Sequence, residues 1–261
     1  MYKEIRSSIR SLILDVLGSF SAPKAGVHIL NGHAFREFSS DSEAFKGLLF
    51  ELSKKVTFVN FEDAVRNIVK GVEIVEPQVC FTFDDGYTDC KYIASILDSY
   101  SISACFFINP NYVMGDDAYI KHFNDNIVFN SGKYPMRWSD IEVLKNQGHI
   151  IGAHTMDHYM LNKGELDALD YQIKHCRNVI EEAINEKCRY FAFPYGRLSQ
   201  INEEAVRIAV NTYDYVFSQS NYKHYYSFNG RVINRRHFEP YWKYKPVSYT
   251  HLRAHETGAY L

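Results

Sequence analysis

The chain has 261 residues, 46% of them hydrophobic, so it can bury the core of one barrel-sized α/β domain or of two smaller domains. A formal net charge of −2 gives no electrostatic basis for binding nucleic acid or an anionic membrane surface. Aromatic residues make up 15% of the chain. We expect most of them in the core and some in a surface on which sugar rings stack.

Residues 1–25 predict an amphipathic segment, because basic residues precede an apolar run that Asp15 interrupts and that is too short to span a membrane. No small-residue cleavage site follows it cleanly. Five scattered cysteines without a CxxC pair favour reduced, buried thiols over a disulfide framework or a zinc knuckle. These features together predict a cytoplasmic protein without a transmembrane segment.

Strand and helix patterns alternate along the first part of the chain. Strands are predicted at residues 26–31, 56–59, 79–83 and 102–108, and helices at 43–54, 61–69 and 92–97. A polar, aromatic stretch at residues 112–136 then predicts a long irregular insertion, of a kind that is usually functional or mobile.

The alternation resumes after the insertion. Helices are predicted at residues 139–147, 165–183 and 202–210, and strands at 148–153, 189–193, 215–218 and 231–234. This order predicts a mainly parallel sheet in one domain over residues 26–245.

The last residues, 246–261, stand apart from this pattern. Residues 247–257 read Val-Ser-Tyr-Thr-His-Leu-Arg-Ala-His-Glu-Thr and match one reading frame of a transposase-type sequencing adapter. We therefore expect the natural sequence to end near Lys245 and treat residues 246–261 as a non-native tail. Its His251 and His255 are set aside as ligands for the same reason.

Two adjacent carboxylates, Asp84 and Asp85, end the apolar run 79–83 and precede Gly86. The carboxyl edge of a parallel sheet is where the sites of α/β proteins lie. Adjacent carboxylates repel each other, so a site that keeps them together supplies a cation or shares a proton between them. The sequence therefore predicts a cation site with further ligands downstream.

Two further motifs follow predicted strands. His154 and His158, at positions i and i+4, would lie on the same side of a helical turn. One carboxylate with two histidines is a donor set typical of catalytic divalent metals. The rigid turn 193–196 could direct backbone amides inward. Each motif alone is more often structural, but three of them at strand ends favour a site.

Together these motifs resemble those of the polysaccharide deacetylases, the NodB-homology group of carbohydrate esterase family four. Residues 82–86 (Thr-Phe-Asp-Asp-Gly) match the first motif, 154–158 (His-Thr-Met-Asp-His) the second and 192–196 (Ala-Phe-Pro-Tyr-Gly) part of the third, while Trp138 and residues 148–152 are also similar. The likeness covers roughly residues 26–240. It implies an α/β fold, a distorted (β/α) barrel with mainly parallel strands, and the removal of acetyl groups from N-acetylated sugars.

The resemblance also implies a role for each matching residue. Asp85, His154 and His158 would bind a divalent metal, with Zn²⁺ expected and Co²⁺, Ni²⁺ or Mn²⁺ as alternatives. Asp84 would be the general base that takes a proton from the attacking water, and the amide of Tyr195 would hold the oxyanion. Pro194 in the same motif is a candidate for substrate binding, and the partner would be a carbohydrate.

Two positions depart from the family pattern. Many members have an arginine at the position of Ala192, where it pairs with the base, and here Arg235 or Arg236 could supply that charge or lie solvated at the surface. The family's Leu-x-His, which carries the leaving-group acid, has no clear match before residue 245. His237 is the nearest candidate for this acid, and the alternative is a residue lost with the natural end of the chain.

Two other functions remain open at this stage. One is a catalytically silent carbohydrate-binding or assembly protein on the same fold, which the missing arginine and the unplaced acid favour. The other is a deacylase that removes a different N-acyl group, such as formyl, from a lipid-linked sugar. The sequence leaves the oligomeric state undetermined.

Overall fold

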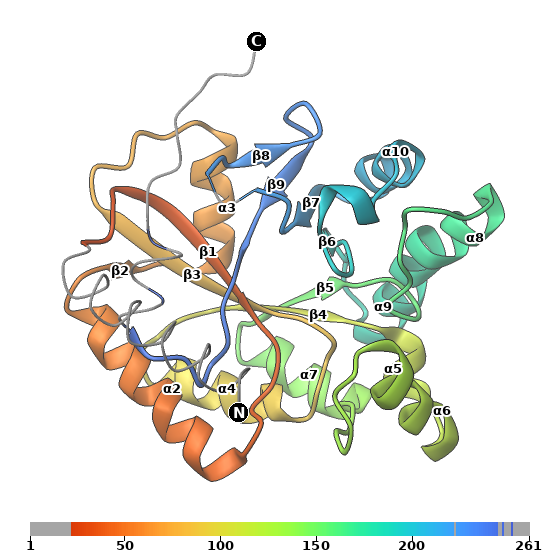
Figure 1. Cartoon of the computed structure of the whole chain (residues 1–261), viewed down its shortest axis with the longest axis horizontal. Helices are drawn as coiled ribbons and strands as arrows, with labels where there is room; N and C mark the ends of the chain where they lie inside the picture. The colour runs from red at the N-terminus through yellow and green to blue at the C-terminus, as the bar shows by residue number, and fades with distance from the viewer. Residues whose placement is uncertain (1–21, 222, 245–246, 248–251, 253–261) are drawn as a thin grey trace, which may run out of the picture.

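The structure is a computed structural model and describes residues 22–221, 223–244, 247 and 252 (Figure 1). Most of the predicted N-terminal segment, and most of the tail at 246–261, lie outside the described residues. Within the tail, Val247 and Leu252 are buried, and the amide of Lys24 donates a hydrogen bond to the carbonyl of Leu252. The division of the chain into segment, domain and tail stays a prediction.

Ten strands and nine α-helices form the described part of the chain. The strands are β1 Gly26–Gly32, β2 Thr57–Phe58, β3 Pro77–Phe83, β4 Cys105–Ile108, β5 Ile150–Ala153, β6 Tyr190–Ala192, β7 Tyr215–Ser218, β8 Tyr226–Ser227, β9 Val232–Asn234 and β10 Arg236–His237. The α-helices are α2 Phe38–Ser53, α3 Phe61–Val69, α4 Asp89–Asp98, α5 Pro110–Met114, α6 Asp117–His122, α7 Trp138–Asn146, α8 Leu166–Asp170, α9 Cys176–Ile184 and α10 Glu203–Thr212. Short turns of other helix types are η1 Phe123–Ile127, η2 Tyr171–His175 and η3 Leu198–Gln200.

The strands form one curled sheet in the order β10-β1-β3-β4-β5-β6-β7-β9-β8, with β2 beside β3. All pairings are parallel except that of β8 with β9. β9 pairs with β7, β10 pairs with β1, and only Arg235 separates β9 from β10. This single segment therefore joins the two ends of the sheet, as the blue chain in Figure 1 shows, and the predicted distorted (β/α) barrel is confirmed.

The apolar run that predicted β3 is buried on both faces of the sheet. Val79, Phe81 and Phe83 pack into the core cluster that includes α2 and α4, whereas Cys80 joins a second cluster on the other face with residues of β1, β4 and β7. Side chains of a strand alternate between faces, so each apolar position meets one of the two cores. The register aligns Gly32 of β1 with Phe83, the last residue of β3, so the residues that follow these strands lie side by side.

The prediction of an irregular insertion at residues 112–136 is wrong for the first part of that stretch. Residues 110–127 form α5, α6 and η1, and only the stretch from 128 onward lacks helical structure before α7. The reason is a small core of its own, in which the rings of Tyr112 and Phe123 stack with centroids 4.0 Å apart and Ile120 is buried beside them. Aromatic residues that looked like a polar loop in the sequence therefore stabilise short helices by tertiary packing.

Three smaller expectations are tested by the described residues. The helix predicted at 43–54 begins at Phe38, because Asp41 accepts hydrogen bonds from the amides of Arg36 and Glu37 and the polar cluster lies inside the first turn. All five cysteines are free and buried, as predicted. No helix in the described part of the chain is both long and apolar enough to cross a bilayer.

Candidate active site

The carboxyl ends of the parallel strands surround a cavity of about 500 Å³. Residues that follow β1, β3, β5, β6 and β7 line it, together with β10 and residues 127–130 of the insertion. Of the residues predicted for the site, the cavity lining contains Asp84, Asp85, His154, His158, Tyr195 and His237. Pro194 is buried but does not line the cavity.

Asp84, directly after β3, is held by a buried arginine. The guanidinium of Arg235 donates to both carboxylate oxygens, with Nη1–Oδ1 at 2.7 Å and Nη2–Oδ2 at 2.9 Å. Both side chains are almost fully buried, at 0% and 2% exposure. The side-chain amide of Asn31 donates a further hydrogen bond, from Nδ2 to Oδ2 of Asp84 at 3.0 Å. Two-fold arginine contact of this kind is the strongest geometry for fixing a carboxylate.

This environment keeps Asp84 ionised. Burial alone would raise the pKa of Asp84, but the charge of Arg235, with a smaller contribution from His154, holds that pKa well below its usual range. Arg235 reaches this position because it lies between β9 and β10, where the sheet closes, and its amide is fixed to the carbonyl of Ser218.

Arg236 has a different environment from its neighbour. Its side chain is buried, and its Nη1 lies 2.8 Å from Nδ1 of His28 in β1. Successive residues of a strand face opposite sides of a sheet, so only one of two adjacent arginines can face Asp84. Of the two candidates that the sequence left open, Arg235 is the one that contacts Asp84, and neither is a solvated surface residue.

Asp85, His154 and His158 form a buried group of three metal-ligand types. The Oδ1 atom of Asp85 lies 3.5 Å from Nε2 of His158 and 3.7 Å from Nε2 of His154. This oxygen has no hydrogen-bond donor among the described residues. The three ligand atoms lie within 4.8 Å of one another, which is compatible with a single ion between them.

The protonation of the two histidines also suits a metal. Burial lowers the pKa of His154 to about 4 and that of His158 to about 3, although Asp84 acts in the opposite direction, so both rings are neutral at pH 7. Nδ1 of His154 lies 2.7 Å from the carbonyl of Ala192 and donates to it, which leaves the lone pair on Nε2. The Nε2 lone pair of His154, the Nε2 atom of His158 and one unpartnered carboxylate oxygen converge, and these residues fit a divalent cation.

The expectation that His154 and His158 share a helical turn is wrong. The segment after β5 is an irregular loop in which Thr155 and His158 have positive φ angles of 65° and 54°. Oγ1 of Thr155 accepts a hydrogen bond from the amide of Tyr159, so this side chain orders the loop. The imidazole rings still meet, with centroids 5.1 Å apart, because the loop folds back on itself.

Asp157 fastens this loop to its surroundings. Its carboxylate accepts hydrogen bonds from Tyr119 of α6, from Asn111 of α5 and from Gln172 of η2. The helical first part of the insertion therefore holds the segment that lies between the two histidines.

The third motif is a strained turn after β6. Tyr195 and Gly196 both have positive φ angles, of 60° and 74°. A Cβ atom at residue 196 would lie 2.7 Å from the backbone nitrogen of Gln219, so only glycine fits there. The amide of Tyr195 has no hydrogen-bond acceptor among the described residues, and its ring packs against that of His158 at 4.6 Å. Backbone strain of this kind is concentrated at functional sites.

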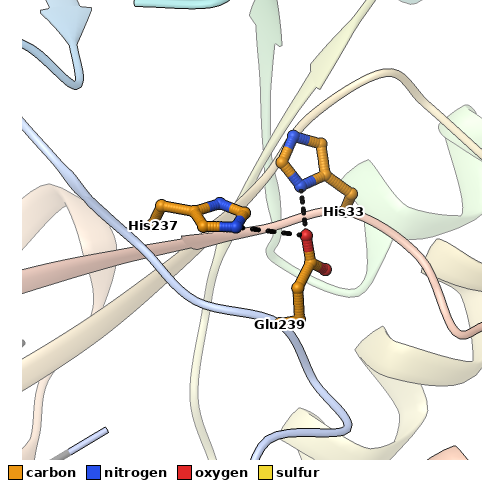
Figure 2. A group of neighbouring side chains, drawn as sticks. All are labelled: His33, His237 and Glu239. Carbon is orange, nitrogen blue, oxygen red and sulfur yellow. Dashed lines mark hydrogen bonds and ion pairs between the residues drawn. The ribbon is translucent and has the colours of Figure 1, made fainter. Parts of the chain in front are cut away.

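Two cavity residues were missed from the sequence, His33 after β1 and Glu239 after β10. Nδ1 of His33 lies 3.0 Å from Oε1 of Glu239, and Nε2 of His237 lies 3.5 Å from the same oxygen (Figure 2). His33 directly follows a predicted strand, which is the signal that also found Asp84. A lone histidine carries no motif, and Glu239 lies 206 residues away in the sequence.

The electrostatic environment gives His33 and His237 different protonation states. Burial alone would lower the pKa of His33, but the carboxylates of Glu239, Asp85 and Asp84 raise it to about 10. The pKa of His237 is lowered, first by burial and then by the charge of His33. At neutral pH, His33 therefore carries a proton and His237 does not.

The fold and the site define a class of protein: an α/β barrel with a buried group of two histidines and one carboxylate that could hold a metal, beside an ionised carboxylate. The chain belongs to the polysaccharide deacetylase family, whose model, described as "Polysaccharide deacetylase", matches residues 72–216, more than half of the chain. No curated protein matches this sequence significantly.

Solved structures of deacetylases share the fold. The Streptococcus pyogenes deacetylase PplD, in complex with acetate, is 16% identical with a TM-score of 0.65, and the match covers 88% of this chain and 99% of that one. IcaB from Ammonifex degensii is 19% identical with a TM-score of 0.62, over 84% of this chain and 94% of its own. A de-N-acetylase from Aggregatibacter actinomycetemcomitans is 16% identical with a TM-score of 0.63, over 85% and 98%.

Proposed function

We propose that this protein is a metal-dependent hydrolase that removes N-acetyl groups from an N-acetylated sugar, a polysaccharide or a glycan precursor. The observation that carries this proposal is the pairing of two arrangements in one cavity. Asp84 is ionised by Arg235, and next to it lies the Asp85–His154–His158 set with its unpartnered oxygen. Family membership supports the same reaction.

The metal, expected to be Zn²⁺ with Co²⁺, Ni²⁺ or Mn²⁺ as alternatives, would be held by Asp85, His154 and His158 and would polarise the amide carbonyl and acidify a water. Asp84 accepts the proton of the attacking water, while Arg235 and Asn31 hold its carboxylate in place. The free amide of Tyr195 donates a hydrogen bond to the oxyanion. The strained turn at Gly196 fixes the direction of this amide.

We assign the leaving-group acid to His33 instead of the sequence candidate His237. A leaving amine needs a proton, and His33 is the imidazole in the cavity whose pKa is raised to about 10. Glu239 keeps that proton on His33 through the 3.0 Å contact. His237, whose pKa is lowered, is neutral and packs beside His33 with ring centroids 5.4 Å apart.

The proposal is tested by assaying acetate release from acetylated chito-oligomers in the presence of added zinc or cobalt. Asp84→Asn should abolish hydrolysis but leave metal bound, because Asp84 takes the proton and Asp85 supplies the ligand oxygen. Asp63→Asn, at an exposed position of α3, is the matched control and should keep full activity. Full activity in Asp84→Asn would show that another group is the base.

The rival function, a silent carbohydrate-binding or assembly protein, makes a different prediction for the same assay. Such a protein would bind sugar with no acetate release at any metal concentration. The intact pairing of Arg235 with Asp84 argues against it, because a binding protein has no need for an ionised carboxylate beside a metal set. Including N-formyl sugars in the panel tests the alternative acyl group.

A further inference from the structure

A second group of potential metal ligands lies in the same cavity. His33 follows β1, His237 belongs to β10 and Glu239 follows it, so the strand pairing that closes the barrel brings the three together. Their ligand atoms lie within 4.8 Å of one another. Figure 2 shows both imidazoles directed at one carboxylate oxygen of Glu239.

The spacing of these atoms is close to that of a tetrahedral metal site. Zinc binds histidine nitrogen and carboxylate oxygen at 2.0–2.2 Å, which places neighbouring ligand atoms about 3.4 Å apart. Oε1 of Glu239 lies 3.0 Å from Nδ1 of His33 and 3.5 Å from Nε2 of His237, on either side of that value. These two distances need to change by only a few tenths of an ångström to match it.

A single proton bonds fewer of these three side chains than a metal cation would. The proton between His33 and Glu239 satisfies one contact, while the 3.5 Å separation leaves Nε2 of His237 without a short hydrogen bond to that oxygen. A cation would be coordinated by all three side chains.

Arg36, a cation on the cavity wall, has partners other than this group. The guanidinium of Arg36 stacks on the ring of Tyr241 at 3.6 Å and lies 3.5 Å from the carboxylate of Asp41. The three side chains of the group are also reachable from the cavity, with exposures of 28% for His33, 32% for His237 and 14% for Glu239.

We propose that His33, His237 and Glu239 form a second divalent-cation site, separate from the Asp85–His154–His158 set, that takes a zinc-like ion when metal is in excess. The consequence rests on the proposed function. A cation bound to Nδ1 of His33 occupies the imidazole that the proposed function assigns to the leaving amine, so filling this site inhibits hydrolysis. Activity would then rise with the first equivalent of metal and fall with the second.

Binding stoichiometry tests the site without any catalytic readout. The probe is Zn²⁺ in equilibrium dialysis, with Co²⁺ absorption as a report on tetrahedral coordination. We expect two equivalents for the full chain, one for His237→Ala and for Glu239→Gln, and one for His158→Ala. His122→Ala removes an exposed histidine on α6 and should keep two. A variant lacking His251 and His255 accounts for binding by the tail.

One equivalent in the full chain, or two equivalents retained by both His237→Ala and Glu239→Gln, would overturn the proposal. Inhibition is measured separately, as the ratio of acetate release at a large zinc excess to release at one equivalent, for each protein against itself. We expect this ratio to be about one tenth for the full chain and close to one for His237→Ala. Two-site binding without any acetate release would leave the cation site standing and refute the proposed function.

Discussion

Replacing Arg235 with methionine tests how the buried ion pair with Asp84 is maintained. The substitution keeps much of the side-chain volume but removes the charge that contacts both oxygens of a carboxylate only 2% exposed. Removing one partner of a buried pair costs about 3–5 kcal/mol, because the other charge remains buried and uncompensated. Domains of this kind have a total stability of about 5–15 kcal/mol, so the loss is a large fraction.

The pH dependence of this loss has a definite sign. The pKa of Asp84 in the folded protein lies below its unfolded value of about 3.9, so the pair's contribution is present above that pH and is lost as pH falls through the folded pKa. In Arg235→Met, burial loses its largest opposing influence and the pKa of Asp84 rises. The difference in unfolding free energy between the two proteins should therefore be largest at neutral pH and shrink on acidification.

Urea unfolding of the chelator-treated proteins at pH values from about 8 to about 4 measures this difference. Arg207→Met, which removes an exposed partner of Glu204, is the matched control and should leave the midpoint nearly unchanged because exposed pairs are screened. The double variant Asp84→Asn, Arg235→Met should lose less than the sum of the single changes. A loss below about 1 kcal/mol at neutral pH, or one that does not vary with pH, would refute the reasoning.

Three other changes have defined outcomes. Gly196→Ala should lower the free energy of unfolding by about 1–3 kcal/mol and reduce acetate release by displacing the Tyr195 amide. Gly132→Ala is the control for backbone strain alone, because Gly132 has a similar φ of 79° and open space around it. Equal losses of stability in the two variants would exclude the contact with Gln219 as a cause. Chelation should lower the thermal midpoint of the full chain more than that of His158→Ala, which keeps only the second site, and an identical drop in both would place the stabilising metal elsewhere. Glu239→Gln should shift the alkaline side of the pH profile of acetate release to lower pH, because His33 loses the nearest carboxylate that raises its pKa. An unchanged pH profile would exclude His33 as the leaving-group acid.

The sequence located the part of the site that follows strands directly. Asp84, Asp85 and His154 each come immediately after a predicted strand, and the carboxyl ends of parallel strands meet at one edge. The sequence narrowed the partner of Asp84 only to Arg235 or Arg236, because the contact of Arg235 with Asp84 spans 151 residues and depends on how the sheet closes. His33 and Glu239 carry no motif, and their proximity is likewise a product of closure.

The errors have the same origin in tertiary structure. The spacing of His154 and His158 fits a helical turn, but Thr155 and His158 adopt left-handed backbone angles that no sequence periodicity reports. The insertion was read as irregular because its aromatic residues show no helical period, although Tyr112 and Phe123 fold it around their stacked rings. The mainly parallel sheet was predictable from the alternation of strands and helices, and the barrel from the resemblance to the family, whereas the loops required the packed structure.

The segment from β9 to Glu239 gives the barrel its last connection, brings Arg235 to Asp84, and delivers His237 and Glu239 to the cavity. Without this segment, the Asp85–His154–His158 group would lack both the arginine that holds Asp84 ionised and the carboxylate that keeps a proton on His33. The strand pairing that closes the barrel is therefore also what supplies the charged partners of Asp84 and His33.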